Sequence, residues 1–113
     1  MRPRTALCVI ASAVALGSAV PAAASAAEGG FTYRYYGEGE IQVGLLINPP
    51  SGQCIDLPEV MDFYDAYAFR PRNFTDRSVT VFKAGGCEGD VFFTLRAGGR
   101  ASDRLLMRSV VFS

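Results

Sequence analysis

The chain has 113 residues, with 11 basic and 11 acidic side chains and no histidine. The absence of histidine excludes Ser/His/Asp and Cys/His nucleophile arrangements and removes the usual imidazole metal ligand. The remaining enzyme mechanisms need an activated Lys83 or a carboxylate pair such as Asp62/Asp65 or Glu38/Glu40. Acids this close together in a solvated segment are typical of solubility rather than of catalysis. We therefore expect a non-enzymatic protein with no catalytic residue, cofactor or metal ligand.

Charge is distributed unevenly along the chain. Residues 28–68 hold seven acids and one base, whereas residues 69–113 hold eight bases and four acids. Either the two halves pair within one sheet system, or they form a bipolar surface that meets a charged partner. Acids exceed bases by two from residue 28 onward, and no compact Lys/Arg run occurs. Nucleic acid is therefore not an expected partner.

Residues 1–27 have the pattern of a secretory signal peptide. Arg2 and Arg4 precede a small and apolar run, Ala6 to Val20, and a segment of small residues follows. The apolar run is shorter than the roughly 20 residues that a membrane span needs. We expect cleavage after Ala26 or Ala27 and a secreted, extracellular, monomeric protein without a membrane anchor.

Residues 28–113 are expected to form one small domain with one disulfide. Cys8 would leave with the signal peptide, so Cys54 and Cys87 remain as a single possible pair. The oxidising exterior favours that bond, which closes a loop worth about 3.8 kcal/mol in the chain-entropy description. Two thiols without a histidine cannot complete a structural zinc site.

The pattern after residue 27 predicts an all-β domain. Short β-rich runs alternate with turn residues, and no segment has helical periodicity. About seven strands are expected, at 31–36, 40–47, 53–57, 67–70, 77–83, 91–95 and 105–112. The first two flank Gly37-Glu38-Gly39, a connection suited to a hairpin. Alternation puts Tyr33 and Tyr35 on one face and Arg34 and Tyr36 on the other.

The least regular segment, 58–73, contains the candidate binding loop. We expect a loop that enters a strand near Tyr67. Its candidate partner-binding residues combine apolar side chains with acids: Glu59, Met61, Asp62, Phe63, Tyr64, Asp65 and Tyr67. They either cap an open end of the sandwich or form an exposed aromatic patch rimmed by acids, as in many protein-binding surfaces. The sequon Asn73-Phe74-Thr75 is interpreted as a turn.

The stretch VFKAGGCEGD, residues 81–90, carries a family resemblance. Phe82, Cys87 and Gly89 have the spacing of the aromatic-x4-aromatic-x-Gly corner that the βγ-crystallin Greek key contains, with cysteine as the second aromatic. In that family the corner folds a hairpin back over its sheet, and the glycine takes a conformation that a Cβ would obstruct. Val91–Leu95 and Arg108–Phe112 look like the third and fourth strands of the same motif.

The resemblance covers residues 78–112, and the first half matches less well. There, residues 52–57 and 66–71 are similar to a third and a fourth strand, but no corner is present. On this mapping a bond between Cys54 and Cys87 joins two motifs. The resemblance implies a small Greek key β-sandwich of βγ-crystallin-like type, similar to small secreted actinobacterial proteins.

The resemblance also bears on ligands and function. The calcium motif of the family would fall on Arg104–Ser109, where only Ser109 matches, so we expect no calcium site. Secreted relatives of this type include a metalloproteinase inhibitor and killer-toxin-like proteins, but a likeness of fold transfers no reactive residue. We expect an extracellular module that binds a protein, with protease inhibition as one form of it. The alternatives are a stable structural or stress-associated protein and an antagonistic toxin.

Overall fold

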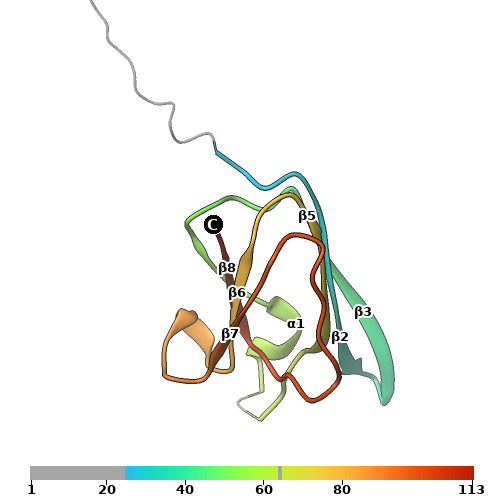
Figure 1. Cartoon of the computed structure of the whole chain (residues 1–113). Coiled ribbons are helices and arrows are strands. Elements are labelled where there is room, and N and C mark those ends of the chain that lie inside the picture. The colour runs from blue at the N-terminus through green and yellow to red at the C-terminus, as the bar shows by residue number, and fades with distance from the viewer. Residues whose placement is uncertain (1–24, 64) are drawn as a thin grey trace, which may run out of the picture.

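The computed structural model describes residues 25–63 and 65–113 and places them mainly in two antiparallel sheets (Figure 1). The elements are β2 (Gly29–Gly37), β3 (Glu40–Ile47), β4 (Cys54–Asp56), α1 (Pro58–Met61), β5 (Phe69–Thr75), β6 (Val79–Phe82), the 3-10 turn η2 (Gly85–Cys87), β7 (Phe92–Leu95) and β8 (Ser109–Phe112). One sheet has the order β3-β2-β5 and the other β4-β8-β6-β7. The predicted all-β, sandwich-like fold with about seven strands is confirmed.

The two halves of the chain interleave. β5, from the basic half, pairs with β2 in the three-stranded sheet, and β4, from the acidic half, pairs with β8 in the other. Because each sheet contains strands from both halves, neither half can complete a sheet alone. The acidic and the basic half of the chain are therefore combined in both sheets of one domain.

The core lies between the sheets and is filled by alternate strand residues. Phe31 is fully buried, and its ring meets that of Phe112 edge to face at 5.5 Å between centroids. Tyr33 is 1% exposed and Tyr35 packs partly buried against the same core, whereas Tyr36 is 68% exposed. The predicted division of the tyrosines between the two faces of β2 is confirmed.

A tight hairpin joins β2 to β3. Its two connecting residues, Glu38 and Gly39, have φ values of 55° and 80°, as a type I′ turn requires. Further along β3, Gly44 lies opposite Tyr33, and a Cβ at this position would overlap the tyrosine ring. A glycine in mid-strand therefore gives the buried ring its space.

The segment 58–73 is more regular than expected. It begins with one turn of helix, α1, and β5 runs on to Thr75, so the prediction of a turn at Asn73-Phe74-Thr75 is wrong. Asn73 is 1% exposed, and its amide nitrogen donates to the carbonyl oxygens of Arg77 at 2.7 Å and Arg96 at 3.0 Å. These tertiary hydrogen bonds hold a residue that usually favours turns inside a strand.

A second difference concerns the predicted third strand of the second motif. Phe92–Leu95 pairs directly with β6, so it forms the second arm of the hairpin that the corner connects. Beside β5, the edge strand of the three-stranded sheet, Arg72 instead forms an isolated antiparallel bridge with Arg100.

The start of the described chain packs onto the domain. Ala27 is fully buried, its amide donates to the carbonyl oxygen of Pro49 at 2.8 Å, and Ala26 bridges Pro50. The predicted signal peptide otherwise lies in residues 1–24, outside the described residues. Within 25–63 and 65–113, no helix is long and apolar enough to cross a membrane.

Candidate functional site

The glycine and cysteine corner is a structural device. Cys54 and Cys87 form the predicted disulfide, with their Cα atoms 5.8 Å apart. The Cys87 amide donates to Ser109 Oγ at 2.8 Å, and that hydroxyl donates to the carbonyl oxygen of Ala84 at 2.6 Å. Gly86, with φ of 72°, donates its amide to Asp56 Oδ1 at 2.7 Å. The corner thus covers the outer face of the four-stranded sheet at β4 and β8, which is why Ser109 is buried there.

The candidate loop residues have different environments. Glu59 Oε1 accepts a 2.7 Å hydrogen bond from the hydroxyl of the buried Tyr33, so its carboxylate is directed toward the core. Met61 is partly buried and its methyl group lies against Gly85, within the corner. Tyr67 is partly buried beneath Lys83, whose Nζ is 5.6 Å from the ring centroid.

The remaining loop candidates lie at the surface or outside the description. Phe63 is 64% exposed, and Asp62 and Asp65 are exposed beside it. Tyr64 lies outside the described residues. Arg108 fixes the loop, because its guanidinium donates to the carbonyl oxygens of Val60 at 3.0 Å and Phe63 at 2.9 Å.

Loop and hairpin aromatics meet around one pocket. Its volume is about 380 Å³, and its lining residues are Tyr36, Val60, Phe63, Asp65, Ala66, Tyr67, Phe69 and Leu106. The Tyr36 and Phe69 rings lie 5.5 Å apart at one wall. The structure therefore brings the exposed part of the candidate loop next to Tyr36, the residue that ends the outward row of β2.

A larger apolar surface lies on β3. The strand was predicted from the sequence, but its exposed surface was not. Ile41, Val43, Leu45 and Ile47 are all between 51% and 67% exposed. They lie on the outer face of the three-stranded sheet, where Tyr36 is the neighbour of Ile41 across the hairpin. We call these four residues the β3 row. In EIQVGLLI these four aliphatic residues alternate with Glu40, Gln42, Gly44 and Leu46, so alternation alone would place them inward. The structure instead has them on the outer face.

The same four residues carry the free backbone groups of an edge strand. The Asn48 amide donates to the carbonyl oxygen of Gly29 at 2.8 Å, and hydrogen-bonded pairs alternate along an antiparallel ladder. Gln42, Gly44 and Leu46 therefore direct their N–H and C=O groups to β2. The intervening β3 row directs its N–H and C=O groups away from β2, to an edge where β3 has no neighbour among the described strands.

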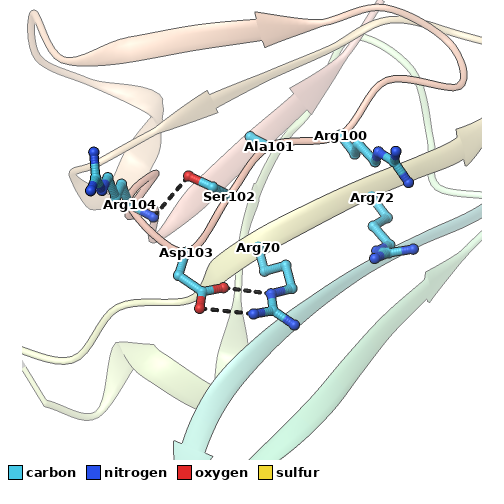
Figure 2. Close-up of a pocket in the computed structure, with 7 residues that line it drawn as sticks. All are labelled: Arg70, Arg72, Arg100, Ala101, Ser102, Asp103 and Arg104. Atoms are coloured by element: carbon cyan, nitrogen blue, oxygen red, sulfur yellow. Dashed lines mark hydrogen bonds and ion pairs between the residues drawn. The ribbon is translucent and has the colours of Figure 1, made fainter.

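Arginines gather beside β5, at the edge of the three-stranded sheet opposite β3. A hollow of about 510 Å³ is lined by Arg70, Arg72, Arg100, Ala101, Ser102, Asp103 and Arg104 (Figure 2). Arg70 donates Nε and Nη2 to the two carboxylate oxygens of Asp103, at 2.5 and 2.9 Å. This hydrogen-bonded pairing holds the pKa of Asp103 below its usual value.

Burial sets the ionisation of Tyr33. Desolvation first, and then the hydrogen bond to the Glu59 carboxylate, raise the pKa of this phenol far above its ordinary value. Tyr33 therefore stays protonated as the donor that ties β2 to α1. Within the part of the chain that the structure describes, no three His, Cys, Asp or Glu side chains gather as metal ligands would.

Comparisons with protein families, with curated proteins and with solved structures find no match to this chain.

Proposed function

We propose that this is a secreted, non-enzymatic binding module whose partner is an extracellular protein that adds an extended segment to the free edge of β3. The observation that carries the proposal is the coincidence of two features in the β3 row. Its four side chains are aliphatic and at least half exposed, and the same four residues hold the edge N–H and C=O groups. An extended strand of the partner would use both features. Its main chain hydrogen-bonds to the edge N–H and C=O groups, and its alternate side chains pack against the β3 row.

The composition of the surrounding surface supports a protein partner. Aromatic residues and arginine are the types enriched in protein interfaces, and Tyr36, Phe63 and Phe74 are exposed at 68%, 64% and 63%. No charged side chain occurs among the outward positions of β3 between Ile41 and Ile47. Charge on an edge is the usual protection against strand pairing, so its absence favours a strand that is meant to pair.

Secretion and fold type belong to the same proposal. The disulfide supports an oxidising compartment. The strand orders β3-β2-β5 and β4-β8-β6-β7, with the bridge of Arg72 to Arg100 beside β5, support a pair of interleaved Greek key motifs of βγ-crystallin-like type. A protease with an extended substrate cleft is one partner that meets the requirement, and in that case the module acts as an inhibitor.

A pair of proline variants tests the edge directly. Val43→Pro removes an N–H that points to the free edge, whereas Gln42→Pro removes one that bonds to β2. We expect Val43→Pro to fold and to lose the protein that wild type captures stoichiometrically from culture filtrate. Gln42→Pro should be destabilised by about 3 kcal/mol, which is the cost of a proline in a helix interior, because here too a backbone hydrogen bond is lost.

A matched control separates edge pairing from general stickiness. Thr94→Lys places a charge on β7, the edge strand of the other sheet, and should leave capture unchanged. Val43→Lys should abolish it. Capture that survives both Val43→Pro and Val43→Lys, or no stoichiometric partner for wild type, would overturn the proposal. Self-association through the β3 row, seen as a dimer in sedimentation that Val43→Lys dissociates, would overturn it as well.

A further inference from the structure

The unusual feature outside the β3 row is a pair of arginines placed face to face. Arg72 in β5 and Arg100 are directly opposite in an antiparallel bridge. On either side of them, Asn73 donates its amide to the carbonyl oxygen of Gly99 at 2.8 Å, and Ala101 donates to that of Pro71 at 3.1 Å. Arg72 and Arg100 therefore form a non-hydrogen-bonded pair, the position with the closest cross-strand side chains, about 4.5 Å between Cα atoms.

Two positive charges at this spacing repel each other unless a negative group lies between them. Among the described residues, the ion pairs are those of Arg70 with Asp103 and of Arg77 with Asp76. The one carboxylate that lines the hollow is thus taken up by Arg70 in a bidentate pair. No protein carboxylate within ion-pair distance compensates Arg72 or Arg100 in the described part of the chain.

The backbone beneath the pair is fixed. The Asn73 side chain is buried and donates to the backbone carbonyl oxygens of Arg77 and Arg96. The backbone carbonyl oxygen of Asn73 accepts the Gly98 amide at 2.8 Å. In Figure 2 Arg72 and Arg100 lie next to each other at one end of the hollow, and Arg104 lies at the other end with its side chain directed away. Two arginines held on a fixed backbone thus lie next to each other in the lining of one hollow.

We propose that Arg72 and Arg100 form a binding site for a phosphate or sulfate group. A guanidinium fork binds two oxygens of an oxyanion, so two forks need a group with at least three oxygens. A tetrahedral dianion supplies these oxygens and cancels both charges, whereas a carboxylate serves one fork. The ligand class is therefore a phosphate or sulfate, as the free ion or as an ester on a larger molecule.

Thermal unfolding with inorganic phosphate or sulfate, against chloride at equal ionic strength, tests the site. A ligand that binds only the folded state raises the melting temperature by mass action. We expect this rise for wild type and its loss in Arg72→Gln and Arg100→Gln. In chloride alone the two variants should melt no lower than wild type, because the repulsion is gone. A merely structural arginine would give a lower melting temperature.

Calorimetric titration with inorganic phosphate gives a second readout that does not depend on unfolding. Losing one charged hydrogen-bonding partner should weaken binding roughly 10- to 100-fold. Arg104→Gln is the matched control, since Arg104 lines the same hollow but turns away, and it should bind as wild type does. A phosphate response equal to that of chloride, or one that persists in Arg72→Gln/Arg100→Gln, would overturn the proposal.

Titration with a phosphoserine-rich polypeptide, which carries phosphate monoesters, and with a sulfated polysaccharide distinguishes the sources. Tighter binding of either polymer than of its free ion, lost in Arg72→Gln, identifies an ester on a larger molecule as the ligand. Equal binding per charged group identifies the ion itself. Binding of the polymers that Arg72→Gln/Arg100→Gln retains in full would contradict the site.

Discussion

The outer faces of the two sheets differ in what covers them. Over the four-stranded sheet, the chain folds back at residues 83–90 and is held there by the disulfide and by Ser109. On the outer face of the three-stranded sheet, the β3 row remains exposed. A domain of this size has a modest core, and the corner both covers apolar surface and closes a loop. The corner therefore stabilises the domain, whereas the β3 row is the surface that we propose for the partner.

The largest expected effect comes from opening the covered face. Reduction, or the double variant Cys54→Ala/Cys87→Ala, should lower the free energy of unfolding by roughly 2 to 4 kcal/mol. Urea unfolding of oxidised and reduced protein measures the difference. Because the β3 row lies on the other sheet, partner capture should survive reduction wherever the domain remains folded. Equal stability of the two forms would contradict the stapling role of the corner.

The next effect separates the inner side of β3 from its outer side. Gly44→Ala should cost about 1 to 3 kcal/mol, because the new methyl group overlaps the buried Tyr33 ring. Val43→Ala, one residue away but facing outward, should change stability by less than about 0.5 kcal/mol. Chemical unfolding of both variants provides the test. Similar losses at the two positions would mean that the β3 row is not free.

A smaller effect should appear at alkaline pH. The pKa of Tyr33 is raised in the folded state, so the unfolded chain loses this proton first. The stability that Tyr33 contributes is fully present below the ordinary tyrosine pKa of about 10 and declines as the pH rises above it. Melting temperatures from pH 8 to 11 should show this decline, with Tyr33→Phe less steep and the exposed Tyr36→Phe unchanged. Parallel curves for wild type and Tyr33→Phe would contradict the assignment.

The smallest effect concerns the start of the mature chain. The sequence predicts Ala27 or Glu28 as the first residue, but Ala27 is buried and bonded to Pro49. These contacts favour the first of the two predicted starts, because a chain that begins at Ala27 keeps them and one that begins at Glu28 does not. Intact mass of secreted protein measures the start. A chain that begins at Glu28 should melt slightly lower than one that begins at Ala27, and an identical melting temperature would show that the contacts of Ala27 add nothing.

Strand number and the disulfide could be predicted because they depend on local signals. Three such signals each have one favourable outcome: the alternation in residues 31–36, the glycine-bearing connection Gly37-Glu38-Gly39, and the single pair of cysteines outside the predicted signal peptide. The strand conformation of Asn73 could not be predicted, because it depends on carbonyl groups of Arg77 and Arg96 that only the tertiary fold brings near.

The functional surfaces were harder to predict for the same physical reason. Exposed Phe63 was a candidate from the sequence, whereas Glu59 and Tyr67 were not expected to be tied to Tyr33 and Lys83. The β3 row could not be recognised, because an aliphatic residue in a strand is exposed or buried according to which sheet covers it. Likewise, Arg72 and Arg100 are 28 positions apart, and only their bridge makes them neighbours.

Amide hydrogen exchange along β3 tests the central proposal most directly. In the free protein, the amides of Ile41, Val43, Leu45 and Ile47 should exchange quickly, and those of Gln42, Gly44 and Leu46 slowly, because only the latter bond to β2. With the captured partner bound, the fast set should become protected as well, and the alternation should disappear. Alternation that persists in the complex, with new protection confined to residues 59–67, would contradict strand addition at β3.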